Sequence, residues 1–289
     1  MPKIGVVGTP GGWSSEWLAD AAAKRTGYRL LIDLAKVSLD LGSGILWFED
    51  VELNKLDALI LKKAGARYSP ALLDRLELLR AINERGLPMF SKPYSILRVL
   101  DRLSCTVTLA NGGIPMPPTT ITEDVEAALL AVEDYGESVF KPLYSTKARG
   151  MMVVSAGPKA RPLVEQFHRE FGIMYIQQKL DIGDQDLGVV FLGGEYLTTY
   201  ARCKTGDSWN TTTRSGGKYQ AYEPSAETVE LARKAQALFD LDFTCVDVAE
   251  TANGPLVFEV SAFGGFRGIQ TASNMDAAEL YIDYVLQKI

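Results

Sequence analysis

The chain has 289 residues, enough for a large core and more than one domain. Its hydrophobic fraction of 47% and charged fraction of 23% are typical of a soluble globular protein, and a formal net charge of −6 provides no overall positive field for nucleic acid. No apolar run approaches the roughly 20 residues that span a membrane, and three widely separated cysteines indicate reduced thiols in a cytoplasmic protein.

Residues 1–95 have the alternating pattern of a small doubly wound α/β domain. The strand KIGVVG leads through the turn GTPGG into a helix pattern. This turn is not a GxGxxG fingerprint, and an anion site at the helix N-terminus and a tight packing turn both fit it. The buried strand LDALIL ends in Lys62, Lys63 and Arg67, at the strand end where ligands of open α/β sheets bind. These cations either bind an acidic substrate or form a solvated basic loop.

The middle of the chain predicts helices and strands with a cationic turn between them. A helix over 71–85 is followed by the strand LPMFS, and residues 91–113 have one continuous helix pattern. After a Pro-rich connector and an acidic helix, the strand SVFKPLYS contains Lys141, and the turn STKARGM adds Lys147 and Arg149. A lysine within an apolar strand, followed by such a turn, is a plausible phosphate-binding element, although the P-loop sequence is absent.

The last third predicts a strand, a hairpin across Gly193–Gly194, a polar segment and two helices. The polar segment KTGDSWNTTTRSGG is long for a compact fold and is therefore expected to be functional or mobile. The single histidine, His168, lies in an amphipathic helix pattern and is expected at its surface or boundary. Any chemistry must then use carboxylates, lysines, arginines and the backbone.

The segment 244–268 carries the strongest chemical signal. The apolar runs CVDVA and LVFEV flank the turn sequence ETANGP, which predicts a β-hairpin. If the turn centres on 252–253, Asp247 and Glu259 lie opposite each other on one face, because side chains alternate along a strand. The residues predicted to fill the other face, toward a core, are Val246, Val248, Phe258 and Val260. The two carboxylates either bind a cation such as Mg²⁺, or one pairs with Lys or Arg and the other faces water.

Taken in this order, the segments resemble the ATP-grasp fold, specifically the RimK-like carboxylate–amine ligases, over nearly the whole chain. LDALILKKAGAR resembles a first-domain strand and substrate loop, FKPLYSTKARGM a strand lysine and phosphate loop, and IQQKLDIGDQD the adenine-binding hinge. WNTTTRSGG resembles the Asn-containing segment, and VDVAETANGPLVFEVSA the metal segment. The resemblance implies an α/β fold with a pre-ATP-grasp domain at 1–95, a central lobe at 96–176 and a C-terminal lobe at 177–289. More loosely, GTPGGWSSE and KPLYSTKARGM resemble the ATP-grasp member of a bacterial gene system called GAK.

The resemblance assigns roles residue by residue. The nucleotide-binding residues that it implies are Lys141, Lys147, Arg149, Gln178, Lys179, Leu180, Asp186 (for ribose) and Arg102. The residues near the transferred phosphate are Arg202, Asn210 and Arg214, and those for the metal are Asp247, Glu259 and Ser261. Candidates for an acidic substrate are Lys63, Arg67 and Arg267.

The chain also departs from the family pattern. Ser261 stands where the third metal ligand is usually Asn, and Arg102 replaces a first-lobe lysine. The phosphate loop keeps Gly150 but has Ser145 and Ala148 where the family tends to have glycine.

The resemblance implies an ATP-dependent, ADP-forming carboxylate–amine ligase that forms an acyl phosphate with one or two Mg²⁺ ions, for which Mn²⁺ can substitute. The substrates would be a small-molecule or peptide carboxylate and an amino acid or similar amine; neither nucleic acid nor a membrane is expected as a partner, and a homo-oligomer is left open. One alternative is a nucleotide-binding regulator without turnover. Another, which depends on GTPGG alone, is a Rossmann-type NAD or S-adenosylmethionine enzyme with no role for Lys141.

Overall fold

A computed structural model describes residues 1–146, 148–206, 208–212 and 215–289 and confirms the predicted α/β class. The N-terminal sheet has the parallel order β2-β1-β6-β7, and a small antiparallel sheet has the order β3-β4-β5. The strands are β1 (Ile4–Val7), β2 (Leu31–Ile32), β3 (Val37–Asp40), β4 (Ile45–Phe48), β5 (Val51–Glu52), β6 (Ala58–Leu61) and β7 (Met89–Phe90). β1 and β6 are buried along their whole length, as expected for a parallel sheet with helices on its faces. Those helices include α1 (Trp13–Thr26) and α2 (Ala71–Asn83).

The predicted helix at 91–113 is two helices. α3 (Pro93–Leu100) ends where Asp101 turns to an extended conformation, and α4 (Arg102–Asn111) begins at the next residue. The Asp101 carboxylate accepts the backbone N–H of Leu103 and so caps α4. The single-helix prediction is therefore wrong, and the break places Arg102 in the first turn of α4.

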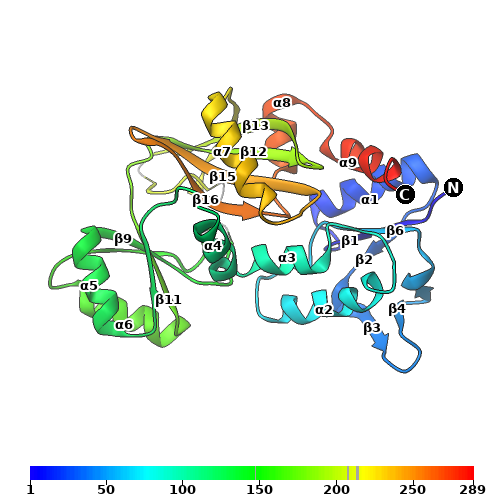
Figure 1. Cartoon of the computed structure of the whole chain (residues 1–289), viewed down its shortest axis with the longest axis horizontal. Helices are drawn as coiled ribbons and strands as arrows, with labels where there is room; N and C mark the ends of the chain where they lie inside the picture. The colour runs from blue at the N-terminus through cyan, green and yellow to red at the C-terminus, as the bar shows by residue number, and fades with distance from the viewer. Residues whose placement is uncertain (147, 207, 213–214) are drawn as a thin grey trace.

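The central lobe is an antiparallel sheet of order β10-β9-β11-β8 with two helices packed on it (Figure 1). Its elements are β8 (Thr119–Thr122), α5 (Val125–Tyr135), β9 (Glu137–Lys141), β10 (Met152–Ser155), α6 (Ala160–Phe171) and β11 (Met174–Gln178). The apolar side chains of both helices and of β9, β10 and β11 form a core of their own. β11 crosses the expected lobe boundary at 176, so the end of this strand leads directly toward the third lobe.

The C-terminal lobe is an antiparallel sheet of order β14-β13-β12-β15-β16. Its elements are β12 (Gln185–Leu192), β13 (Glu195–Cys203), β14 (Lys218–Ala221), α7 (Ala226–Ala237), β15 (Phe243–Thr251), β16 (Gly254–Ser261), α8 (Phe266–Ser273) and α9 (Ala277–Leu286). The sequence did not predict α8. One face of the sheet packs beneath α7, and the last helix returns to pack beside α1 near both chain ends (Figure 1).

The N-terminal domain and the C-terminal lobe share hydrophobic packing. Ile4 and Leu18 belong to one buried cluster with Phe243, Tyr281 and Val285. The central lobe, with a separate core, projects from this joint body (Figure 1). Lys141 thus belongs to a lobe with a hydrophobic core of its own, whereas Asp247 and Glu259 belong to the joint body.

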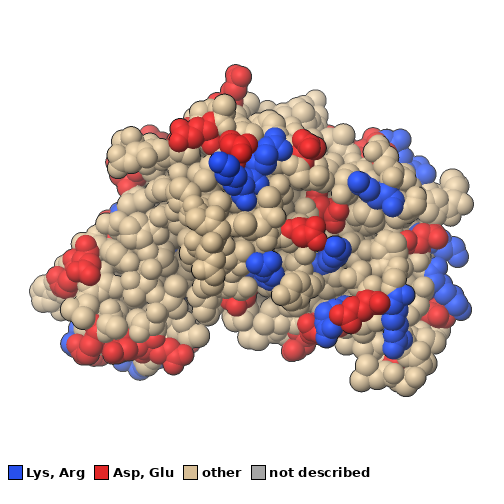
Figure 2. All heavy atoms as spheres, viewed as in Figure 1, with Lys and Arg blue, Asp and Glu red and all other residues tan. Residues whose placement is uncertain are grey.

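The surface agrees with the acidic composition. In the view of Figure 2, lysines and arginines are interspersed with aspartates and glutamates, and acidic side chains gather along the outer edge of the central lobe. Across the described ranges, no helix is both long enough and apolar enough to cross a membrane.

Candidate active site

A cavity of about 360 Å³ lies between the central and C-terminal lobes. Its walls come from β9, β11 and the turn after β9 on one side, and from β12, β13, β15 and β16 on the other. The predicted site residues that line it are Arg102, Lys141, Gln178, Lys179, Leu180, Asp186, Arg202, Asn210, Asp247, Glu259 and Ser261. Segments far apart in the sequence thus converge on one space.

Other predicted residues lie outside the described ranges or away from the cavity. Lys147 and Arg214 lie outside the described residues. Arg149 is exposed and does not line the cavity. Arg67 is also exposed, and Arg267 places its guanidinium 4.9 Å from the ring centre of Trp13 rather than in the cavity.

The β15–β16 hairpin pairs the two predicted metal carboxylates. Its strands end at Thr251 and restart at Gly254, as predicted, and Asp247 lies opposite Glu259. The register then shifts after Asp247, so that Val248 pairs with Val257.

This irregularity corrects one prediction. Phe258 does not face the core; Val257 does, with no exposed surface, together with Val246, Val248 and Val260. One extra residue in a strand reverses the facing of the residues beyond it. Phe258 instead lines the cavity, with its ring centre 5.4 Å from the Lys141 Nζ.

The sheet register also brings Arg202 and Asp186 to the same face. Arg202 pairs across strands with Asp186, and Gly188, two residues on, lies opposite Asp247. The Arg202 guanidinium donates to both oxygens of Asp186 and lies 3.1 Å from Asp247 Oδ2. Burial raises the pKa of Asp247 to about 6; Arg202 opposes this increase, while the carboxylates of Asp186 and Glu259 reinforce it.

Glu259 has a second arginine as its partner. Arg102 Nη1 lies 3.2 Å from Glu259 Oε2, and the Arg102 side chain is only 8% exposed. The same guanidinium donates to the carbonyl of Pro142 at 3.2 Å and reaches the carbonyl of Ser145 at 3.5 Å. Arg102 therefore connects the turn after β9, which the sequence predicts to bind phosphate, to a carboxylate of the C-terminal lobe.

Lys141 is a buried amine with no carboxylate partner in the described part of the chain. Its Nζ donates to Gln177 Oε1, and no carboxylate of the described residues is within ion-pair distance. The rings of Tyr175 and Phe258 flank it, at 5.9 and 5.4 Å. Burial, and then the Arg102 charge, lower the pKa of Lys141 to about 7, against the opposite effects of Glu259 and Asp247. An anion in the cavity would supply the missing counter-charge.

The residues that follow the end of β11, together with neighbouring residues of β9 and its turn, form an apolar wall of the cavity. Val139, Met151, Leu180 and Ile182 line this part of the cavity. The Gln178 and Lys179 N–H groups already donate within the lobe, at 2.9 Å each, to Pro118 and Glu137.

Lys62 and Lys63 lie beneath the segment that follows the predicted metal ligands. The Lys62 Nζ donates to the carbonyls of Phe263 and Gly264 at 3.3 Å each and lies 3.5 Å from the ring centre of Phe266. Lys62 is 1% exposed, and burial, followed by the charge of Lys63, lowers its pKa well below its ordinary value. Lys63 Nζ reaches the same Phe263 carbonyl at 3.4 Å and does not line the cavity. A solvated loop is thus the wrong description of Lys62.

Several polar and aromatic residues of the cavity were not predicted as site residues from the sequence. Gln177, Tyr200, Trp209 and Tyr219 line the cavity alongside the predicted ones. A signal existed for Gln177 and Tyr200, because each lies two residues before a predicted site residue, Lys179 and Arg202 respectively, and side chains alternate along a strand. Trp209 begins the segment WNTTTRSGG that the sequence singles out, and for Tyr219 we find no comparable sequence signal.

Backbone N–H groups of the GTPGG turn already donate to side chains of the following helix. The Gly11 N–H donates to Glu16 Oε1 at 2.7 Å, and the Thr9 N–H to Ser15 Oγ at 3.1 Å. These contacts favour the packing turn over the anion site, and the turn offers no support for a dinucleotide enzyme.

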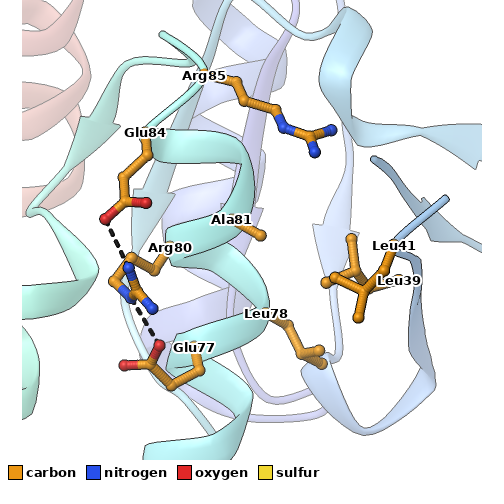
Figure 3. A pocket seen from close by; sticks show the side chains of 8 residues that line it. All are labelled: Leu39, Leu41, Glu77, Leu78, Arg80, Ala81, Glu84 and Arg85. Atoms are coloured by element: carbon orange, nitrogen blue, oxygen red, sulfur yellow. Dashed lines mark hydrogen bonds and ion pairs between the residues drawn. The ribbon is translucent and has the colours of Figure 1, made fainter. Parts of the chain in front are cut away.

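Another cavity, of about 440 Å³, lies between α2 and the β3–β4 hairpin (Figure 3). Leu39, Leu41 and Leu78 face it, and Arg80 pairs with both Glu77 and Glu84 at 2.6 Å. Arg80, Glu77 and Glu84 thus neutralise one another on the surface of α2, and their arrangement does not indicate a charged ligand. We therefore place the active site between the lobes.

Comparison with known proteins agrees with this geometry. The tetrahydromethanopterin:alpha-L-glutamate ligase of Methanosarcina acetivorans is 26% identical, with 99% of each chain covered. The solved structure of the ATP-grasp ligase PsnB with its minimal precursor has a TM-score of 0.76 at 19% identity, over 100% of this chain and 99% of PsnB. A RimK domain ATP-grasp protein from Sphaerobacter thermophilus has a TM-score of 0.74 at 19% identity, over 98% and 99%.

The two structural matches show a shared fold. The description "RimK-like ATP-grasp domain" matches residues 99–285, which include every cavity residue predicted from the sequence. The resemblance seen in the sequence is thereby confirmed, and the chain belongs to the RimK-like ATP-grasp family.

Proposed function

We propose that this chain uses ATP and Mg²⁺ to convert a carboxylate into an acyl phosphate, which an amine then attacks to form an amide. The broader class, ATP-dependent and ADP-forming carboxylate–amine ligation, follows from membership of the family. The observation that carries the proposal is the cavity itself, where Lys141, which has no carboxylate partner among the described residues, and the carboxylates of Asp247 and Glu259 line one space. Its volume of about 360 Å³ lies within the ~300–1,000 Å³ of small-molecule sites.

The nucleotide would lie across the cavity with its phosphates toward Lys141. The ammonium supplies charge to the α- and β-phosphates, and the apolar wall at the end of β11 accepts the adenine ring. Because the N–H groups of Gln178 and Lys179 are already used, Leu180 N–H and the Lys179 carbonyl are left for the adenine edge. Asp186 is proposed to accept hydrogen bonds from the ribose hydroxyls. Its two carboxylate oxygens also accept from the Arg202 guanidinium.

The donor set fits Mg²⁺. Asp247, Glu259 and Ser261 offer hard oxygen ligands on one side of the cavity. Among the described residues no group of three His, Cys, Asp or Glu side chains could hold a metal, so nucleotide phosphates and water must complete the shell. When bound, Mg²⁺ neutralises phosphate charge, and Mn²⁺ is proposed as a substitute because it also accepts such ligands.

The residues of the chain would act by position and charge. Arg202, fixed by Asp186, presents its guanidinium where charge develops on the transferred γ-phosphate. Asn210 accepts from the Thr212 N–H and hydroxyl through Oδ1, which leaves its amide N–H₂ to donate to a phosphate or carbonyl oxygen. The substrate carboxylate attacks the γ-phosphorus and ADP leaves; the amine then attacks the acyl carbon and expels phosphate. No protein nucleophile is needed.

For the amine we propose an amino acid and for the acid a small-molecule or peptide carboxylate. The glutamate ligases among the relatives, and PsnB with its precursor peptide, support these classes. Lys63, Arg67 and Arg267 stay proposals for the acidic substrate, and the reaction scheme does not depend on them. All three cysteines are free, which supports a reducing, cytoplasmic location, and a homo-oligomer is also left as a proposal.

A nucleotide-binding protein without turnover is the second candidate, because Ser261 offers a neutral hydroxyl at the third metal position. The deciding experiment measures ADP release with Mg²⁺ over a panel of amino acids and carboxylates, with products identified by mass spectrometry. With an ¹⁸O-labelled carboxylate we expect one ¹⁸O in the released phosphate, and no turnover in Asp247→Asn. Unlabelled phosphate would contradict the acyl phosphate, and nucleotide binding without turnover over the whole panel would favour the second candidate.

A further inference from the structure

Each carboxylate of the metal site has one oxygen held by an arginine. Arg202 lies 3.1 Å from Asp247 Oδ2, and Arg102 lies 3.2 Å from Glu259 Oε2. Among the described residues, the other Asp247 oxygen, Oδ1, accepts a hydrogen bond only from the Cys245 thiol, at 3.9 Å. Glu259 Oε1 accepts no hydrogen bond from the described residues. The site therefore presents one open oxygen from each carboxylate.

Arg102 is fixed rather than loosely placed at Glu259. It begins α4, its side chain is 8% exposed, and the carbonyls of Pro142 and Ser145 receive its other donors. A planar guanidinium with three such partners has one orientation, unlike the mobile ammonium of a lysine. Arg102 could leave Glu259 Oε2 only by giving up its backbone partners as well.

Ser261 does not supply a metal ligand to replace Glu259 Oε2, which accepts from Arg102. Its hydroxyl already accepts the Phe263 N–H at 3.3 Å, and it carries no charge. Two divalent cations bridged by Glu259 would need both of its oxygens and a strong third donor. A cation on Oε2 would also lie next to the Arg102 guanidinium and be repelled by it.

We propose that the chain holds a single divalent cation with its nucleotide, on Asp247 Oδ1 and Glu259 Oε1, and that the Arg102 guanidinium takes the place of a second cation at Glu259 Oε2. Arg102 then supplies a fixed positive charge to the phosphates from the chain itself. This inference rests on the proposed function, since it concerns the metal of the same ATP site. It also implies that free Mg²⁺, beyond that carried by the nucleotide, does not activate the enzyme.

The test counts bound metal without using activity. Free Mn²⁺ is measured by its electron paramagnetic resonance signal during titration of the whole protein, saturated with the non-hydrolysable analogue AMPPNP. We expect one Mn²⁺ per chain in the wild type and a second in Arg102→Met with Ser261→Asn, which frees Oε2 and restores an amide ligand. Arg98→Met is the matched control, because Arg98 contacts Leu238 and Thr108 rather than the cavity.

Two Mn²⁺ ions per wild-type chain would overturn the inference, and that measurement needs no variant to fold. A folded Arg102→Met/Ser261→Asn protein that still binds one Mn²⁺ would overturn the role given to Arg102. Absence of AMPPNP binding by the wild type would instead contradict the proposed function. The circular dichroism spectrum and melting temperature establish that each variant is folded.

Discussion

Nucleotide binding should take up a proton at Lys141. In the folded chain burial lowers the pKa of this ammonium from 10.5 to about 7. The difference corresponds to roughly 5 kcal/mol of preference for the neutral amine, at about 1.4 kcal/mol per unit. A triphosphate in the cavity supplies the counter-charge that the described residues do not, so the bound state should restore the ammonium.

The expected size of the effect can be calculated from these values. At pH 8.5, about 3% of the free protein would carry a charged Lys141, whereas nearly all of the complex would. Binding therefore takes up about one proton, and affinity should fall about tenfold per pH unit between pH 7.5 and 9.5. Asp247, whose pKa is raised to about 6, is already ionised in this range and does not contribute.

Isothermal titration of Mg²⁺ and AMPPNP at pH 8.5, in buffers of different ionisation enthalpy, measures this uptake. We expect about one proton for the wild type and for Lys92→Met, an exposed lysine paired with Asp240 outside the cavity. Lys141→Met should show none. Absence of uptake in the wild type, or uptake that persists in Lys141→Met, would refute the role of this lysine.

Stability of the free protein gives an independent check on the same residue. The folded pKa of Lys141 lies below the unfolded value, so the unfolded chain binds more protons between about pH 7 and 10.5. The destabilising contribution of this buried lysine to the unfolding free energy is therefore largest below about pH 7. It decreases as the pH rises from about 7 to 10.5, and the unfolding free energy rises correspondingly. The unfolding free energy of Lys141→Met should lack this rise.

Asp247, Arg202 and Lys62 give three further predictions. Metal affinity of the AMPPNP complex should fall as pH decreases through about 6, because Asp247 binds metal only when ionised; an unchanged affinity at pH 5 would argue against Asp247 as a ligand. Arg202→Met should lower the unfolding free energy by about 1–3 kcal/mol in urea titrations, since it leaves two partly buried carboxylates without their guanidinium, and adding Asp186→Asn should recover part; a loss below about 0.5 kcal/mol would contradict this. Lys62→Met should raise the melting temperature, because the cost of burying the Lys62 charge, which lowers its pKa well below the ordinary value, exceeds the gain from its long hydrogen bonds to the carbonyls of 263–264; a lower melting temperature would show that the ammonium stabilises the fold.

Some features of the site could be predicted because they depend on local pattern. A two-residue alternation and one clear turn sequence predict the β15–β16 hairpin and its turn, and the structure confirms that Asp247 lies opposite Glu259. A regular register from that turn would place Asp247 opposite Phe258, so the observed pair depends on the register shift after Asp247. The position of Lys141 in a strand could also be predicted, because the residues before it form an apolar run typical of a strand. The irregularity that turns Phe258 into the cavity could not be derived, because one extra residue in a strand leaves no mark in the hydrophobic pattern.

Other features depend on contacts between distant segments. Arg102 and Glu259 are 157 residues apart, and the sequence gives no sign that they pair. Lys62 at a strand end is typical of a surface loop, yet rings from Phe243 and Phe266 cover it once the C-terminal lobe packs on the first sheet. The break at Asp101 had a readable signal, since aspartate is a favoured helix N-cap, and that signal was outweighed by the apolar pattern on both sides.

A crystal structure of the chain with AMPPNP and Mg²⁺ would test the proposed site most directly. We predict the triphosphate between the lobes, with Lys141 Nζ in hydrogen-bond contact with a phosphate oxygen and with Mg²⁺ joining the phosphates to Asp247 and Glu259. A triphosphate bound elsewhere, or Mg²⁺ that reaches the phosphates without either carboxylate, would contradict this site.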